Sequence, residues 1–315
     1  MKVGLWLTAR HAPGRSPEAH FAALLEQVAL ARSAGFGMVS SGQHYLSPRL
    51  QTMPLLARLA ADAGEMEMAT SVLLLPLHNP VAVAEDAATM QVLLDGRFVL
   101  GVGLGHDRAE RVAFGITDAD AVPRFEASLE IMRRVWSGDG RPVVGRDFSL
   151  PERSAPPVGR PPRVWIGGNS PAARRRAAAS DAAWFPSGLS VDALVRDQSE
   201  LDQLVHGAGG HVPCDRPVGL WLHVSETDAA ARVVARQVGH LQTDQSDRPG
   251  TIIGSAERCL GALREYRDAA GCSHVLLRVE VPGMTQRDVM RRIELLGTVV
   301  LPALASDGTT LPARS

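Results

Sequence analysis

Met68-Ala-Thr-Ser-Val-Leu-Leu-Leu75 and Phe98-Val-Leu-Gly-Val102 are two β-type runs of sequence, and the segment from Pro80 to Leu94 between them has a helical pattern. A strand, a helix and a strand at this spacing predict a β-α-β unit, whose strands are parallel and whose crossover is right-handed. The second run is apolar throughout, as expected for a strand that is covered on both faces. This stretch therefore predicts a buried parallel sheet.

The same alternation extends along nearly the whole chain. Further strands are predicted at Val3 to Leu7, Gly37 to Ser40, Arg163 to Ile166, Ala182 to Phe185, Val218 to Val224 and His274 to Val279. Further helices are predicted at Pro17 to Ser33, Thr52 to Ala63, Pro123 to Trp136, Pro171 to Ala179, Val191 to Leu204, Ala256 to Ala269 and Thr285 to Leu301. Eight strands and eight helices predict an α/β fold with one domain, a single (β/α)8 TIM barrel over residues 1–305.

Local signals refine this architecture. Ser16-Pro17, Asn79-Pro80 and Ser170-Pro171 each place a capping side chain before a proline, which predicts a helix start. Residues 137–162, between the fourth helix and the fifth strand, are rich in Gly, Pro and charge and predict a surface excursion with one short hairpin. Residues 306–315 are predicted to be a disordered tail.

Composition limits the classes of function. A net charge of −1, from 33 Lys and Arg against 34 Asp and Glu, offers no basic surface for nucleic acid or anionic lipid. We see neither a signal-peptide core nor an apolar run of the ~20 residues that a membrane span needs, so a cytoplasmic location is expected. The three cysteines form no Cys-x-x-Cys pair and predict neither a disulfide framework nor a zinc ribbon.

Candidate site residues follow the strands, because the loops after the strand carboxyl ends build the active site of a β/α barrel. His44, His78 and His106 follow the second, third and fourth strands, and Gly167-Gly168-Asn169-Ser170 follows the fifth. In that loop, glycines allow close approach of a ligand and Ser170 caps a helix whose free N–H groups favour an anion. The loop is therefore either a phosphate site or a plain tight turn with a helix cap.

Gly101-Val-Gly103-Leu-Gly105 does not complete a dinucleotide fingerprint, since the next glycine would have to stand where His106 does. These glycines either clear space for a flat ligand over the barrel or form a tight turn. The histidines include no His-x-His pair, so we predict no metal site. His78 is interpreted as a helix-entry residue, whereas His44, with polar neighbours at a strand end, suits proton transfer.

Four motifs together resemble the bacterial luciferase-like flavin-dependent monooxygenases. They are Val72-Leu-Leu-Leu-Pro-Leu-His-Asn-Pro80, Asp95-Gly-Arg-Phe-Val-Leu-Gly-Val-Gly-Leu-Gly105, Arg124-Phe-Glu-Ala-Ser-Leu-Glu-Ile-Met-Arg-Arg-Val-Trp136 and Trp165-Ile-Gly-Gly-Asn-Ser170. The resemblance runs in order from Met1 to about Leu301. It implies a β/α barrel, usually a homodimer, that binds FMN or the deazaflavin F420 at the strand carboxyl ends.

The resemblance also implies roles for particular residues. The flavin phosphate would be held by Gly167, Gly168, Asn169 and Ser170, and Gly103 would lie close to the ring system. The Ser71-Val72 segment is similar to a place where many members carry a non-prolyl cis peptide behind the ring. His44 falls where the family often has a histidine beside the flavin. The acidic residue that commonly precedes that histidine is Gln43 here, so the sequence predicts no carboxylate partner for His44.

Three functions remain open from the sequence. The first is a monooxygenase that oxidises a small organic molecule with oxygen and with reduced FMN from a separate flavin reductase. The second is an F420-dependent reductase or dehydrogenase that moves a hydride without oxygen. The third is a flavin-binding barrel without catalysis. The candidates for lining the substrate pocket are His11, His106 and Trp184.

Overall fold

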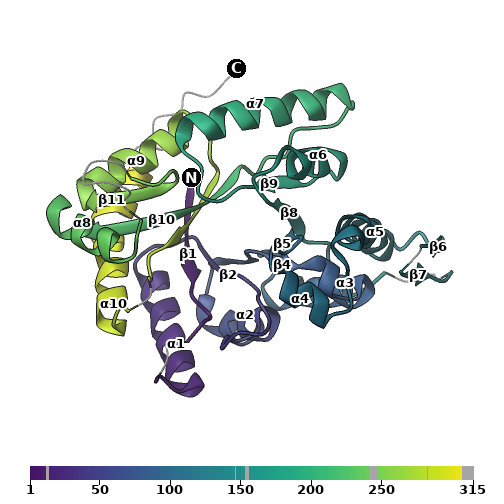
Figure 1. Cartoon of the computed structure of the whole chain (residues 1–315), viewed down its shortest axis with the longest axis horizontal. Helices are drawn as coiled ribbons and strands as arrows, with labels where there is room; N and C mark the ends of the chain where they lie inside the picture. The colour runs from purple at the N-terminus through teal and green to yellow at the C-terminus, as the bar shows by residue number, and fades with distance from the viewer. Residues whose placement is uncertain (12–13, 146, 153–155, 241–246, 282, 307–315) are drawn as a thin grey trace.

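Parallel strands form a ring at the centre of the protein, and helices lie around its outside (Figure 1). The structure, a computed structural model, describes residues 1–11, 14–145, 147–152, 156–240, 247–281 and 283–306. Within these residues eight strands make up the ring, in this order: β1 (Lys2–Leu7), β2 (Met38–Ser41), β3 (Glu67–Thr70), β5 (Phe98–Gly103), β8 (Arg163–Gly167), β9 (Ala183–Phe185), β10 (Pro217–Ser225) and β12 (His274–Arg278). The β/α barrel expected from the sequence is confirmed.

The ring closes between β9 and β10 through a short bridge rather than a long ladder. Gly219 donates its N–H to the carbonyl oxygen of Pro186 and accepts the N–H of Gly188, both at 2.9 Å. On the opposite side of β10 the pairing is regular, with Val218 beside Val275. β12 then pairs with β1, so that the first and last strands of the ring are neighbours.

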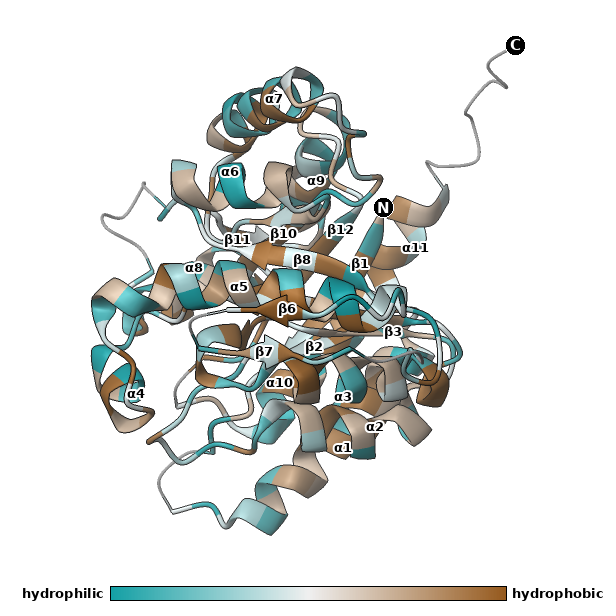
Figure 2. Cartoon of the chain, turned by 90° about the vertical axis from the view of Figure 1, so that its right-hand side faces the viewer, coloured by the Kyte–Doolittle hydropathy of each residue, from teal (hydrophilic) through white to brown (hydrophobic). Residues whose placement is uncertain are grey.

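The helices that connect these strands begin where the capping signals predict. Ser16, Asn79 and Ser170 each accept a backbone N–H from the first turn of the helix that follows. The helices of the outer layer are α1 (Pro17–Ser33), α2 (Thr52–Ala63), α3 (Pro80–Leu93), α5 (Asp118–Ser137), α6 (Pro171–Ala179), α7 (Val191–Gly207), α9 (Ala256–Asp268) and α10 (Gln286–Leu295). Polar and apolar residues alternate along α7 (Figure 2), which buries Leu194 and Leu201 against the barrel.

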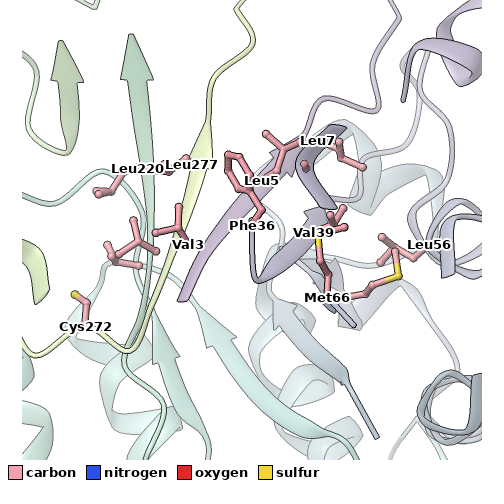
Figure 3. Packing of buried hydrophobic residues seen from close by; sticks show 14 of the residues in the cluster. Val3, Leu5, Leu7, Phe36, Val39, Leu56, Met66, Leu220, Cys272 and Leu277 are labelled. Carbon is pink, nitrogen blue, oxygen red and sulfur yellow. The ribbon is translucent and has the colours of Figure 1, made fainter. Parts of the chain in front are cut away.

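Side chains alternate between the two faces of each strand and so divide the core into two layers. On β1, Val3, Leu5 and Leu7 pack toward the helices in the largest apolar cluster (Figure 3). Trp6, between them, belongs to a second cluster that fills the inside of the ring. That inner cluster consists of Trp6, Met38, Ala69, Val99, Trp165, Ala183, Phe185 and Leu276. Burying each large side chain stabilises the fold by ~1.5–3 kcal/mol relative to exposing it.

A polar network lies at the amino-terminal end of the ring. Glu67 Oε1 accepts hydrogen bonds from Lys2 Nζ at 2.6 Å and from an Arg163 guanidinium nitrogen at 2.7 Å. Glu67 Oε2 lies 3.1 Å from His274 Nε2, and Arg163 also donates to Asp215. Burial alone would raise the pKa of Glu67, but the bonds from His274 and Lys2 and the charge of Arg163 lower that pKa to about 2. This network links strands that are far apart in the sequence, on the amino-terminal side of the apolar layer inside the ring.

The third predicted strand, Met68 to Leu75, is divided in the structure. β3 ends at Thr70, and a two-residue strand, β4 (Leu73–Leu74), resumes the pairing with β5. The peptide bond between Ser71 and Val72 is cis, as the family resemblance implies. The chain therefore leaves the ladder at this segment, which faces the carboxyl end of the ring.

Sequence patterns missed three elements, namely α4 (Arg108–Ala113), α8 (Asp228–Gln237) and β11 (Thr251–Ser255). Helix α8 is amphipathic and buries Ala231 and Ala235, so a helical pattern was present in this segment, but the eight helices predicted for the barrel were complete without it. Strand β11 is not part of the ring and pairs with the second half of β10, while the first half of β10 pairs with β12. Helix α5 also starts earlier than predicted, because the hydroxyl of Thr117 caps it.

The excursion after α5 contains the predicted hairpin. Strands β6 (Val143–Val144) and β7 (Ser149–Leu150) pair antiparallel at the edge of the molecule (Figure 1). At the other end of the chain, α10 continues through a π-helical turn, η2 (Leu296–Val300), into α11 (Leu301–Ser306). Residues 307–315, most of the predicted tail, lie outside the described residues. No helix among the described residues has both the length and the apolar character needed to cross a membrane.

Candidate active site

A cavity of about 800 Å³ lies at the carboxyl ends of the ring strands. A space of this size can hold a flat cofactor and a small substrate together. Its aromatic wall residues are Trp6, Phe185 and Trp221. Its polar and charged wall residues are Thr8, Arg10, His11, Arg15, His20, Gln43, His44, Arg49, Ser71, His106, Ser170, Arg176, Ser187, Arg278 and Glu280.

Most residues singled out from the sequence meet in this cavity. Those in its wall are His11, His44, Ser71, Val72, Gly103, His106, Gly167, Gly168 and Ser170. Asn169 and Trp184 are not in the wall, which differs from the roles predicted for them. Contact of any of these residues with a ligand stays a prediction.

The loop after β8 and the start of α6 form one end of the cavity. The Ser170 hydroxyl accepts the N–H of Ala173 at 3.2 Å and so begins the helix. Gly168 has a φ of +136°, a conformation that side chains other than glycine rarely adopt. Arg176 lies further along α6, also lines the cavity, and pairs with Glu126 at 3.3 Å. A helix amino terminus beside a guanidinium favours a phosphate.

Asn169 and Trp184 support this loop from outside the cavity. The Asn169 side chain donates to the Ser187 carbonyl at 2.7 Å and accepts the Ser187 N–H at 3.0 Å, which joins the loops after β8 and β9. The indole of Trp184 donates to the Gly168 carbonyl at 2.6 Å. Trp184 is only 1% exposed, because alternation along β9 points it outward and points Phe185 into the ring. The proposal that Trp184 lines the substrate pocket is therefore corrected.

Val72 projects into the cavity beside the glycines of the neighbouring strands. A Cβ on Gly103 would lie 2.6 Å from Val72 Cγ2, and a Cβ on Gly167 would lie 2.8 Å from Val72 Cγ1. Neither distance is compatible with ordinary packing. These two glycines thus make room for Val72, whose apolar side chain lines the cavity and could contact a planar ring.

His44 has a carboxylate partner that the sequence reading missed. Glu110 Oε1 lies 3.2 Å from His44 Nδ1 and accepts the backbone N–H of Tyr45 at 2.6 Å. Glu110 stands on α4, and only 2% of it is exposed. The expectation that His44 lacks such a partner is therefore wrong. A signal was present, since Asp107 with an acid three residues later is typical of a helix start.

The carboxylate determines the hydrogen-bonding state of the imidazole. A carboxylate only accepts hydrogen bonds, so Nδ1 of His44 carries the proton and Nε2 of the neutral ring is an acceptor. Burial is the largest influence on the pKa of His44 and lowers it; Arg49 lowers it further, and Glu110 opposes both. At neutral pH the ring is therefore uncharged and able to take a proton at Nε2.

Gln43 has a structural role beside His44. Its side-chain oxygen accepts the Leu74 N–H at 3.0 Å and lies 2.8 Å from His78 Nε2. Its amide nitrogen donates to the Tyr45 hydroxyl at 3.2 Å. Burial lowers the pKa of His78 to about 4, and His78 is not in the cavity wall, which agrees with its interpretation as a helix-entry residue.

Several charged wall residues were not predicted. Arg278 is the last residue of β12, and its guanidinium lies between the rings of Trp6 and Trp221. Glu280 directly follows the predicted eighth strand, and burial raises its pKa to about 7 against the influence of Arg15, Gln27 and Arg278. Both could have been found by extending the search to inward positions at the strand ends. Among the described residues, no three His, Cys, Asp or Glu side chains are grouped to hold a metal ion.

The fold and the cavity define a β/α barrel with a ligand-sized cavity at the carboxyl ends of its strands. The sequence profile of the luciferase-like monooxygenase family matches residues 1–251, so the chain belongs to this family, whose members are oxidoreductases. The chain is 28% identical over 318 residues to a 4-hydroxyprotoasukamycin monooxygenase of Streptomyces nodosus subsp. asukaensis, an alignment that covers 88% of this chain and 82% of that protein.

Solved structures support the fold. The oxygenating constituent of 3,6-diketocamphane monooxygenase from Pseudomonas putida, in complex with FMN, superposes with a TM-score of 0.79 at 19% identity, over 96% of this chain and 98% of that chain. An F420-dependent secondary alcohol dehydrogenase, in complex with an F420–acetone adduct, has a TM-score of 0.77 at 17% identity over the same shares. At these identities the likeness shows the fold alone.

Proposed function

We propose that the chain is a flavin-dependent monooxygenase that oxidises a small organic substrate with reduced FMN and oxygen. The observation that carries the proposal is the pairing of the cavity-lining His44 with the buried carboxylate of Glu110. Burying a carboxylate is costly unless it is paired, and this one serves a side chain in a ligand cavity. Membership of the luciferase-like monooxygenase family adds support.

The wall residues fit an FMN molecule. Gly168, Ser170 and Arg176 would hold its phosphate at the start of α6, and Val72 would back its ring. When bound, reduced FMN would supply the electrons with which one oxygen atom enters the substrate and the other leaves as water.

The residues of the chain itself would orient the reactants and move protons. Nε2 of His44 would accept a proton from the substrate or return one, while Glu110 keeps the ring in the required tautomer. Trp6, Phe185 and Trp221 would exclude water from the reacting groups.

An F420-dependent reductase or dehydrogenase is the second candidate function. It is favoured by the structural likeness to an F420-dependent secondary alcohol dehydrogenase. The same phosphate end and the same apolar backing would serve a deazaflavin, and His44 would then exchange a proton with an oxygen atom of the substrate. A flavin-binding barrel without catalysis would use the buried Glu110 only structurally, as the acceptor of the Tyr45 N–H.

Dissociation constants for reduced FMN, F420 and riboflavin, measured anaerobically on the purified protein, test the proposal. We expect reduced FMN to bind at least as tightly as F420, and riboflavin more weakly than FMN. The bound reduced FMN should then be oxidised when oxygen is admitted. A preference for F420 of tenfold or more would favour the reductase instead.

We also propose that the protein acts as a cytoplasmic homodimer supplied with reduced FMN by a separate reductase. These features follow from the family resemblance and from the composition. Size-exclusion chromatography with light scattering would measure the oligomeric state.

A further inference from the structure

Positive charge is concentrated in one part of the cavity. Five arginines line it, and Glu280 is the one carboxylate among the described wall residues. Arg176 belongs to the phosphate end on α6. The other four, Arg10, Arg15, Arg49 and Arg278, come from β12 and from the loops after β1 and β2.

Arg278 packs against two aromatic rings of the cavity wall. Its guanidinium carbon lies 4.2 Å from the centroid of the Trp6 ring and 4.5 Å from that of the Trp221 ring. The two rings attract the cation without accepting its N–H groups in ordinary hydrogen bonds, so these donors keep their capacity for an anion. None of them donates to a described residue. Burial lowers the pKa of Arg278 to about 10, which leaves the group charged at neutral pH.

Arg49 is a second cation without a hydrogen-bonding partner in the described part of the chain. Its buried Nε makes no hydrogen bond there. Its backbone pairs with that of Arg10, so both side chains start from one bridge. Burial is the largest influence that lowers the pKa of Arg49, followed by the charge of Arg10, and only Glu110 opposes them.

Among the described residues, no carboxylate of the protein forms an ion pair with either of these cations. Glu280 forms no ion pair within 4 Å of Arg278 or Arg49 among the described residues, and its Oε2 is buried without a hydrogen-bond partner. Glu110 is engaged by His44 and Tyr45. Two desolvated guanidinium groups near one another repel, and an anion between them would remove that repulsion.

The flavin phosphate would not reach this place. In the ring of eight strands, β8 stands four strands away from β1 and three strands away from β2 and β12, so the start of α6 lies across the barrel from Trp6 and on the far side from Arg49 and Arg278. One molecule of FMN with its phosphate at α6 therefore leaves the cationic side open. An anion bound in this far part of the cavity would therefore belong to a molecule other than FMN.

We propose that Arg278 and Arg49 bind the anionic group of the substrate, and that the substrate is a planar organic acid. The guanidinium edge matches a carboxylate, and Trp6 and Trp221 offer aromatic surface to the carbon skeleton next to it. His44 lies on the same loop as Arg49, so the proton-accepting Nε2 stands near the bound acid. The identification of the bound acid as the substrate rests on the proposed function, whereas the anion site itself does not.

Calorimetric titration with benzoate and with benzamide tests the site. The two probes have the same planar shape and differ in charge. We expect benzoate to bind at least tenfold more tightly than benzamide, both to the free protein and to the protein loaded with FMN. Arg278→Met and Arg49→Met should each weaken benzoate binding at least tenfold and change benzamide binding less than threefold.

Arg58→Met is the matched control, because Arg58 lies on the surface of α2 and pairs with Asp62. It should leave both affinities unchanged. If Arg278→Met does not fold, Arg49→Met carries the test together with Arg278→Lys, which keeps the charge and should keep part of the preference for benzoate.

Equal affinities for benzoate and benzamide would overturn the proposal. So would displacement of benzoate by FMN, because the cations would then serve the cofactor. Failure of the proposed function is seen separately: a protein that binds benzoate with these properties but neither FMN nor F420 retains the anion site without a flavin activity.

Discussion

Glu110 Oε1 lies 3.2 Å from His44 Nδ1, and the two residues stand after different strands of the ring. His44 follows β2, whereas Glu110 lies on α4 after β5. The carboxylate holds the imidazole in the tautomer with a free Nε2, which is the form that takes a proton. Glu110 is therefore a positioning residue, because it acts on the cavity through His44.

Glu110→Gln should keep the hydrogen bonds and remove the charge. Since the Glu110 carboxylate raises the pKa of His44, its loss should lower that pKa. We expect turnover to fall roughly tenfold and the acidic limb of the pH–rate profile to move to lower pH. Steady-state rates from pH 5 to pH 9 would show the shift.

Arg49→Met serves as the opposite control in that experiment, because Arg49 lowers the pKa of His44 and its loss should move the acidic limb upward. His44→Ala should lower turnover by ~100-fold or more, leave flavin affinity nearly unchanged and abolish both shifts. A normal turnover with a lower melting temperature in His44→Ala would assign His44 a structural role only.

Ser170→Asp should weaken binding of a phosphorylated flavin. Asp also caps helices, so α6 should still form, but its charge would repel the phosphate by ~2 kcal/mol or more once a bound flavin covers this exposed position. The dissociation constant of FMN should rise about thirtyfold, whereas that of riboflavin should stay the same. An equal change for the two flavins would place the phosphate elsewhere.

The sequence was sufficient for the ring strands because each is short, most are largely apolar, and every following helix except α2 begins with a capping side chain. It was insufficient for α8, because this amphipathic helix is additional to the eight helices of a regular barrel, and for β11, where only Ile252 and Ile253 provide an apolar signal. Both elements lie between the seventh and eighth ring strands, where a regular β/α count expects one helix. The extra pair depends on contacts with β10 that a local pattern does not contain.

The position of a residue after a predicted strand was enough to place it in the site. The sequence did not show which side chains contact one another there. His44 and Ser170 were found because they directly follow predicted strands. Glu110 was missed since its contact with His44 spans 66 residues of sequence. Trp184 was misplaced because neighbouring residues of a strand point to opposite faces of the sheet, and the register was not known from the sequence. In the structure Trp184 points toward the helices and Phe185 points into the ring.

Glu67 should make stability depend on acid pH. Its pKa is lowered to about 2 in the folded protein from 4.5, so its contribution is fully present above pH 4.5 and is lost as the pH falls toward 2. The loss should amount to roughly 2–3 kcal/mol. Urea unfolding of the parent and of Glu67→Gln at pH 3 and pH 6 measures it.

The difference in unfolding free energy between parent and Glu67→Gln should be largest at pH 6 and should shrink at pH 3. Glu65→Gln is the control, since the Glu65 side chain is 94% exposed and should change stability little at either pH. A difference between parent and Glu67→Gln that does not vary with pH would contradict the role assigned to this carboxylate.

Gly103→Ala should destabilise the protein through Val72 rather than through the backbone. The added methyl group would lie 2.6 Å from Val72 Cγ2, and overpacking of this kind costs ~1–3 kcal/mol. Val72→Ala removes the methyl group that clashes, at a cost of its own for the lost burial. The double variant should therefore be more stable than the sum of the two single changes predicts, by ~1 kcal/mol or more.

Gly207→Ala is the control, because nothing lies within 4 Å of a Cβ at that position on α7, and it should be neutral or slightly stabilising. Thermal unfolding of the four variants and the parent, together with their FMN dissociation constants, completes the cycle. Additive losses would show that Gly103 is required for a reason other than contact with Val72.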